Sequence, residues 1–75
     1  MTQHESVLNF MRENGSITSM DAFNFFNITR LSARIFELRQ LGHIIDTERV
    51  TAKNIYGHSY TFARYYLVKE AEKND

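Results

Sequence analysis

The stretch ITRLSARIFELRQLGHII, residues 28–45, decides the fold of this chain. Its apolar side chains recur at spacings of 4, 3 and 3, at Leu31, Ile35, Leu38 and Leu41. This period places them on one side of a helix that runs from Arg30 to Leu41. Thr29 is expected to cap the start of this helix, and Gly42 to cap its end.

Two further helices and a short strand are expected ahead of this stretch. Apolar residues recur at helical spacing over residues 3–14, which predicts a first helix. The β-branched side chains in residues 16–18 then indicate a short strand. Ser19 offers an N-cap for a brief helix over residues 20–26. Asn27 tolerates the left-handed conformation, so the second and third helices should meet at a sharp turn.

After Gly42 the pattern becomes typical of strands. Residues 44–53 are rich in Ile, Thr and Val, and residues 58–68 are rich in Tyr, Thr and Phe. The four residues between them, 54–57, include a glycine, so the two runs predict a β-hairpin. Alternation along the second run is expected to turn three side chains toward the helices: Ala63, Tyr65 and Leu67.

Length and composition indicate one small domain. The chain has 75 residues, of which 43% are hydrophobic, and this is enough for a single core. We assign residues 1–68 to the domain and expect residues 69–75 to form a charged, disordered tail. The absence of cysteine excludes disulfides and thiolate zinc sites. Neither a signal peptide nor a membrane span can be placed, so we expect a soluble cytoplasmic protein.

The net charge of the chain is zero, but the charge is unevenly distributed. Residues 1–26 carry a net charge of −2, with three acidic residues against one arginine. Residues 27–68 carry a net charge of +3, with six basic residues against three acidic ones. Positive charge is therefore concentrated in the third helix and the hairpin, where a surface that meets phosphate would have to lie.

This order of elements, with the residues that fill it, resembles a winged helix-turn-helix domain over residues 3–68. Residues 28–45 look like the recognition helix and following strand of that family. The sequence is similar in particular to a group of short helix-turn-helix proteins of phages and prophages. Three further segments stand in the matching order: Glu48-Arg49-Val50-Thr51, Tyr56-Gly57 and Ala63-Arg64-Tyr65. The resemblance implies an α+β fold, a double-stranded DNA partner and a role in transcription regulation.

The third helix carries the side chains best placed to read DNA. Projection at 100° per residue turns its polar residues away from the apolar stripe. In the major groove, Arg can contact guanine, Ser and Thr can contact bases or phosphate, and Ala can meet a thymine methyl group. The predicted readers lie in the N-terminal half of the helix: Thr29, Arg30, Ser32 and Ala33. Arg34 has two interpretations, a contact with phosphate or a structural ion pair with Asp46 or Glu48.

The hairpin is the predicted wing, and Lys53 and Arg64 are its predicted phosphate contacts. The wing is otherwise weakly basic for this role, because Ile55, Tyr60 and Phe62 lie between these two residues. The contribution of the wing to DNA binding is therefore less firmly predicted than that of the helix.

Aromatic residues support a rival hypothesis, in which the same fold binds protein. If Ala22, Phe23 and Phe26 point inward, Phe25 projects outward. Together with Phe62 and Tyr66 on the hairpin it would form an apolar patch that favours a homodimer or another protein partner. Alternatively, Phe25 folds down against the first helix.

The sequence offers no sign of catalysis or of cofactor binding. The three histidines are scattered, without the close spacing of a helical metal pair, so we predict no metal site. A Ser or Thr nucleophile would need an activating base and a pocket, and no motif provides them. We therefore expect no enzyme activity, no cofactor and no small-molecule substrate.

Overall fold

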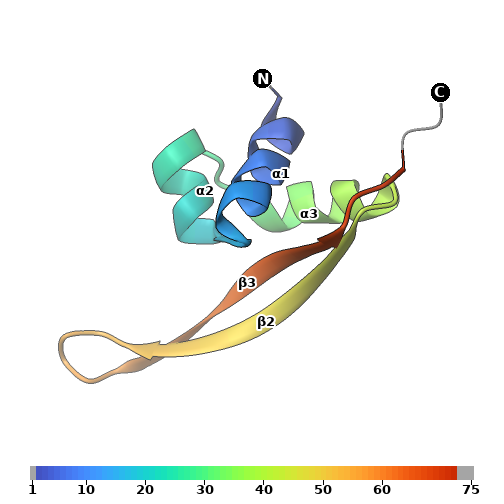
Figure 1. Cartoon of the computed structure of the whole chain (residues 1–75). Coiled ribbons are helices and arrows are strands. Elements are labelled where there is room, and N and C mark those ends of the chain that lie inside the picture. Colours follow the sequence, from blue (N-terminus) through green and yellow to red (C-terminus); the bar gives the residue numbers. More distant parts are fainter. Residues whose placement is uncertain (1, 73–75) are drawn as a thin grey trace.

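The computed structural model describes residues 2–72, and these form three helices on a three-stranded antiparallel sheet (Figure 1). The elements follow in the order α1 (Gln3–Asn14), β1 (Ser16–Thr18), α2 (Ser19–Phe26), α3 (Leu31–Gln40), β2 (Ile44–Lys53) and β3 (Ser59–Lys69). The strand order is β1-β3-β2, so the last strand of the chain is the middle strand of the sheet. The predicted α+β architecture, with a hairpin and a short extra strand, is confirmed.

Helix α2 begins one residue earlier than predicted, because Thr18 and not Ser19 is its N-cap. The Thr18 hydroxyl accepts a hydrogen bond from the Asp21 backbone N–H at 3.2 Å, and the Asp21 carboxylate accepts one from the Thr18 N–H at 3.0 Å. This reciprocal pair is a capping box, which satisfies two backbone donors at once. Thr18 therefore both ends β1 and starts α2.

The turn between α2 and α3 follows the prediction at Asn27 but not at Thr29. Asn27 adopts the left-handed conformation with φ 55°, and its backbone N–H donates to the Phe23 carbonyl at 2.9 Å. The N-cap of α3 is Arg30, with no side-chain cap hydrogen bond, so the cap expected from Thr29 is wrong. Thr29 lies one residue too early, because α3 begins only at Leu31.

The other end of α3 also differs from the prediction. Leu41 is the C-cap and is exposed, so it does not extend the apolar stripe. Gly42 follows with φ +102°, a conformation that side chains rarely adopt. Helix α3 thus ends one residue before its predicted end, and glycine makes the turn into β2.

The core lies where the helices meet the near end of the sheet. Its buried side chains come from all three helices, the α2–α3 turn and two strands: Val7, Leu8, Met11, Ile17, Ala22, Ile28, Leu31, Ile35, Leu38 and Ile45. Tyr65 and Leu67 of β3 pack against this cluster, as predicted. Phe23 is 52% exposed, so its predicted inward position is wrong, while Phe26 packs on the core.

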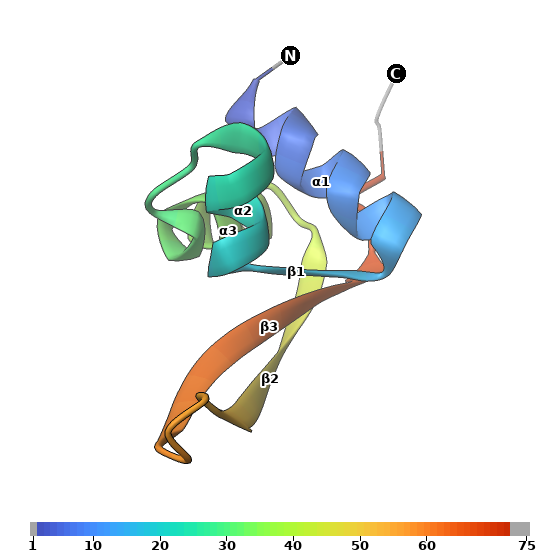
Figure 2. The ribbon, with the colours of Figure 1, turned by 90° about the vertical axis from the view of Figure 1, so that its left-hand side faces the viewer.

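The hairpin of β2, β3 and their connection, which we call the wing, extends far beyond this core (Figure 2). The chain measures 53 × 22 × 21 Å along its principal axes because of this projection. In residues 51–61, which form the distal end of the wing, every residue is exposed except Ala52, which is half-buried. The distal end of the wing therefore contributes nothing to the core and presents both of its faces to solvent.

The contacts of the described chain continue past the predicted domain boundary at residue 68. Strand β3 includes Lys69, the Glu70 carboxylate accepts from Arg12 Nε at 2.9 Å, and the Ala71 backbone N–H donates to His43 Nδ1 at 3.0 Å. These contacts attach the start of the predicted tail to α1 and to the beginning of β2. Residues 73–75 of that tail lie outside the described residues. No helix within residues 2–72 has the length and apolar character needed to cross a bilayer.

Candidate nucleic-acid interface

The N-terminal half of α3 presents the predicted reading residues on the outside of the domain. Thr29, Arg30 and Ser32 are exposed, and Ala33 is half-buried. The Arg30 side chain makes no hydrogen bond or ion pair with any residue in the described range 2–72. Phe36 lies one turn beyond Ser32 and is also exposed, so it extends the same outward face.

The electrostatics at this end of α3 favour an anion. The first turn of α3 contains no acidic residue, and no side chain caps its free backbone N–H groups. The positive end of the helix dipole is therefore not neutralised locally. Arg30 adds a full positive charge at the same place, although a cation here is unfavourable for the helix alone. Such an arrangement is well suited to meet a phosphate or the acceptor edge of a base.

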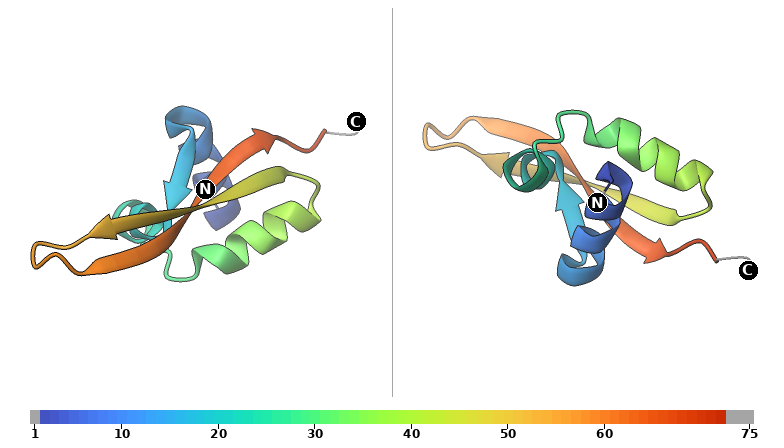
Figure 3. Two further views of the ribbon diagram at one scale, coloured as in Figure 1. Left: turned by 90° about the horizontal axis from the view of Figure 1, so that it is seen from below. Right: turned by 90° about the horizontal axis from the view of Figure 1, so that it is seen from above.

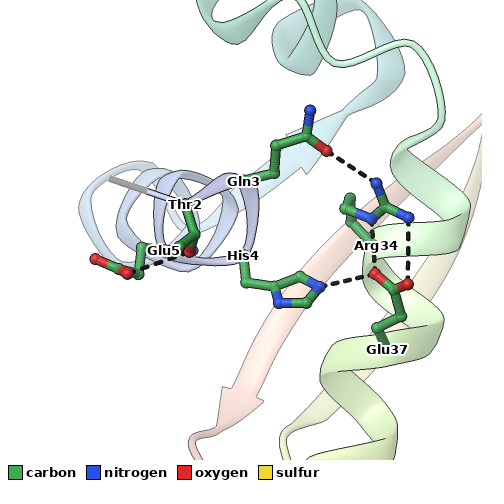
Figure 4. A network of polar contacts seen from close by, with 6 residues as sticks. All are labelled: Thr2, Gln3, His4, Glu5, Arg34 and Glu37. Carbon is green, nitrogen blue, oxygen red and sulfur yellow. Dashed lines mark hydrogen bonds and ion pairs between the residues drawn. The ribbon is translucent and has the colours of Figure 1, made fainter.

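Arg34 belongs to a polar network that joins α3 to α1 (Figure 4). It donates to the two carboxylate oxygens of Glu37 at 2.7 and 3.2 Å, and to Gln3 Oε1 at 2.9 Å. The predicted ion pair of Arg34 is confirmed, but with Glu37 in place of Asp46 or Glu48, and its contact with phosphate stays a prediction. Glu37 lies three residues away on the same helix, a spacing at which side chains are neighbours.

His4 completes this network from α1. Its Nε2 lies 2.7 Å from Glu37 Oε1, within hydrogen-bond distance (Figure 4). The hydrogen bond from His4, followed by that from Arg34, holds the pKa of the Glu37 carboxyl below its ordinary value. The network therefore fixes the orientation of α3 against α1 and uses the charge of Arg34 within the protein.

Arg39 connects the other end of α3 to the wing. Its guanidinium donates to the Ile45 carbonyl oxygen at 3.1 and 2.6 Å and to Thr47 Oγ1 at 2.9 Å. Because Thr47 contacts α3, the face of the wing that carries Thr47 continues on the α3 side of the sheet. These hydrogen bonds attach the start of the wing to the C-terminal end of α3.

The wing has two chemically different faces, which follow from the strand register. Cα pairs Arg49–Ala63, Thr51–Thr61 and Lys53–Ser59 lie on the face that carries Thr47, and we call this the cationic face. The opposite face, which we call the aromatic face, carries the pairs Glu48–Arg64, Val50–Phe62 and Ala52–Tyr60.

This register separates the two predicted phosphate contacts of the wing. Lys53 lies on the cationic face and Arg64 on the aromatic face, so one DNA backbone running along either face would meet only one of them. The basic residue that shares the cationic face with Lys53 is Arg49, which is exposed and lies four positions earlier on the same strand. Strict alternation along residues 49–53 was the signal in the sequence that could have found it.

The aromatic face borders a hollow beneath the start of α2. The rings of Tyr60 and Phe62 stack with centroids 5.9 Å apart. Together with Thr18, Met20 and other residues they line a hollow of about 450 Å³. Met20 is 67% exposed beside it.

Two observations bear on the predicted patch of Phe25, Phe62 and Tyr66. The Phe25 ring lies against Phe10 of α1, with centroids 5.4 Å apart, as in the alternative that it folds down on the first helix, but Phe25 is also 65% exposed, as the outward position predicts. Tyr66 donates its hydroxyl to Glu48 at 3.1 Å. No ring contact within the described part of the chain joins Phe25 to Phe62 or Tyr66, and their role as a partner surface stays a prediction.

Residues 2–72 contain no group of three His, Asp or Glu side chains arranged to hold a metal ion. Three surfaces of the described residues are candidates for binding: the outer face of α3, the cationic face of the wing and the hollow beside the aromatic face.

Comparison with known proteins identifies the family. No curated protein and no solved structure matches the chain. A family model described as a winged helix-turn-helix domain matches residues 2–70, which covers nearly the whole chain and includes every helix and strand described above. Such a domain indicates DNA as the partner. The chain therefore belongs to the winged helix-turn-helix domain family.

Proposed function

We propose that this protein binds double-stranded DNA sequence-specifically, with α3 in the major groove. In this proposal it is a small cytoplasmic regulator of transcription, of the phage and prophage type that its sequence resembles. Membership of the winged helix-turn-helix family supports DNA as the partner. The proposal assigns base contacts to Thr29, Arg30, Ser32 and Ala33, and backbone contacts to the cationic face of the wing.

The observation that carries this proposal is the difference between Arg30 and the two arginines within α3. Arg34 and Arg39 are engaged by Glu37, Gln3 and the start of β2. Arg30, in contrast, is exposed and uncommitted at an uncapped helix start. Because the hydrogen bonds of Arg34 and Arg39 hold α3 in place, the positions of Arg30 and Ser32 relative to the domain are fixed. Specific hydrogen bonds to base edges require donors and acceptors at such fixed positions.

Selection from a pool of random duplexes tests this function. We expect retained duplexes to share a short motif, since base contacts from one helix discriminate at a few positions. A protein with Arg30→Ala should recover a motif that is degenerate at one of these positions. Retention without any enrichment at low salt would contradict sequence-specific binding.

One observation favours a second candidate function, a module that binds protein. Met20 is exposed next to the hollow lined by Tyr60 and Phe62, and this is an apolar surface that DNA would not need. A second copy of this chain is the simplest occupant. Sedimentation of the free protein, compared with that of Met20→Ser, tests this: a dimer that the substitution dissociates would support it, and a monomer would contradict it.

A further inference from the structure

The tip of the wing displays two large apolar side chains that the fold does not use. Ile55 is 92% exposed and Tyr56 is 79% exposed, the largest fractions among the large apolar residues of the described chain. Neither side chain belongs to the core or to its partly buried rim. The two side chains are neighbours at the far end of a projecting hairpin, where such an exposed apolar pair is free to contact a partner.

The connection that carries them is closed by hydrogen bonds. The Asn54 side-chain oxygen accepts from the backbone N–H of Tyr56 at 2.9 Å and from that of His58 at 3.1 Å. The Asn54 N–H donates to the His58 carbonyl at 3.0 Å, and the Gly57 N–H donates to the Asn54 carbonyl at 3.0 Å. Gly57 has φ +79°, which favours glycine. Ile55 and Tyr56 are therefore held at the apex of a defined turn.

The chemistry of the wing around this apex fits a partner that is anionic outside and apolar inside. Residues 49–63 contain no acidic residue, and their basic residues are Arg49 and Lys53, both on the cationic face. Hydroxyl groups from Thr51, Ser59 and Thr61 lie on the cationic face. DNA has this organisation, because phosphates line its grooves and stacked bases fill its interior. Proteins that bend DNA insert apolar side chains between base steps from the minor groove.

The tip of the wing lies beyond the reading end of α3. Thr47 is held by Arg39 in the last turn of α3, and Lys53 lies six residues further along β2, roughly 20 Å at the strand rise of about 3.3 Å. Arg30 lies nine residues before Arg39, roughly 14 Å at the helical rise of about 1.5 Å, so the wing runs back along α3 and its tip passes Arg30. Both views in Figure 3 show the wing extending past the N-terminal end of α3, so the tip lies beyond the reading end of the helix.

We propose that Ile55 and Tyr56 form an apolar wedge that enters the minor groove next to the site of α3, unstacks one base step and kinks the duplex. This inference rests on the proposed function, since it needs α3 to bind DNA. It adds that the protein bends its target and prefers a deformable step, such as TA or CA, on the side of the α3 motif toward which the wing extends.

The test compares the protein with a variant that carries Ile55→Ser and Tyr56→Ser. The matched control is Leu41→Ser, which removes an exposed apolar side chain at the C-terminal end of α3, far from the tip of the wing. The duplex contains the selected motif, a donor and an acceptor dye at its two ends, and 2-aminopurine at successive steps in separate preparations. Energy transfer reports the bend, and 2-aminopurine fluorescence reports unstacking.

We expect the protein and the Leu41→Ser control to bend the duplex by about 20–90° and to raise fluorescence at a single step. The wedge variant should bind the same motif more weakly, without the bend and without the rise in fluorescence. Because both substituted residues are exposed, its circular dichroism spectrum should match that of the unsubstituted protein.

Three other results would overturn the inference in distinguishable ways. If the unsubstituted protein binds no duplex, the proposed function and the wedge both fail. If it binds the motif but leaves the duplex straight, or if the variant bends it equally, DNA binding stands and the wedge fails. If the substitutions leave the bend intact but abolish binding to phosphatidylglycerol vesicles or dissociate a dimer, the tip serves a membrane or a second copy instead.

Discussion

Helix α3 and the wing both carry basic side chains, but they hold them in different ways. In α3, Arg34 and Arg39 are fixed by neighbouring protein groups, and the helix itself is packed on the core. On the wing, Arg49 and Lys53 are exposed and have no partner among the described residues. Fixed groups give a surface of defined shape, whereas free cations adapt to phosphates of any sequence. In the function that we propose, this difference gives specificity to α3 and sequence-independent affinity to the wing.

The largest expected effect tests the contrast between the buried core and the exposed tip of the wing. Leu38→Ala should lower the free energy of unfolding by about 2–5 kcal/mol, because Leu38 is fully buried and its loss leaves a cavity. Ile55→Ala should change it by less than about 0.5 kcal/mol, since that side chain is almost fully exposed. Urea denaturation followed by circular dichroism measures both. Similar losses from the two substitutions would mean that the tip is packed in solution.

The second effect concerns specificity at α3. Arg30→Ala should weaken binding to the selected motif by about 1–3 kcal/mol and relax the preference at one base pair, as expected for a bidentate base contact. Lys69→Ala is the control, because it removes an exposed cation at the base of β3, far from the reading end of α3. Titration of specific and random duplexes gives the ratio of the two affinities, and this ratio shows whether Arg30 contributes to specificity. An unchanged ratio would assign Arg30 to solvent or phosphate.

The third effect tests the two faces of the wing. Replacing both Arg49 and Lys53 by Gln should weaken specific and random duplexes alike and reduce the slope of log affinity against log salt by about 1.8, at about 0.9 per lost phosphate contact. Arg64→Gln, on the opposite face, should leave that slope nearly unchanged. Fluorescence anisotropy over a salt series measures the slope. A larger change from Arg64→Gln would place the DNA backbone on the aromatic face.

The smallest effect concerns the network that holds α3 against α1. The pKa of Glu37 lies below its ordinary value of 4.5, chiefly through the hydrogen bond from His4 and then through that from Arg34. A lowered pKa gives stability that is present above the ordinary value and lost as the pH falls through the folded-state value. Glu37→Gln should therefore lower the urea midpoint slightly at pH 7 and should not lower it at pH values below the folded-state pKa. A difference that persisted in acid would show that the carboxylate charge is not involved.

The residue pattern was sufficient for the elements of this fold, because each is decided by local signals. The apolar period of residues 31–38, the β-branched residue at position 17 and Asn27 at the turn each specify their own element. The caps were harder. Ser19 and Thr29 are both good capping residues, and only the backbone geometry shows that Thr18 caps α2 and that no side chain caps α3.

The candidate site was less predictable, because it depends on contacts between elements. Gln3 and His4 reach Arg34 and Glu37 from 31 to 33 residues away, a distance that no local pattern reports. The faces of the wing depend on the length of its connection. A four-residue connection would have paired Lys53 with His58 and placed Arg64 on the Lys53 face. The observed pairing of Lys53 with Ser59 moves Arg64 to the other face.

The central position of β3 has a consequence for how the protein is made. Every pairing between strands includes β3, and β3 is the last of the six elements along the chain. While the ribosome is still adding residues 59–69, the helices have been synthesised but β1 and β2 have no strand to pair with. Tyr65 and Leu67, which cover the core, also arrive only then. Local helix contacts can form first, but the domain becomes complete only after residue 69 has left the exit tunnel. A messenger RNA truncated before the codon for residue 59 would therefore yield a chain whose core is not covered by β3 and whose strands β1 and β2 are unpaired.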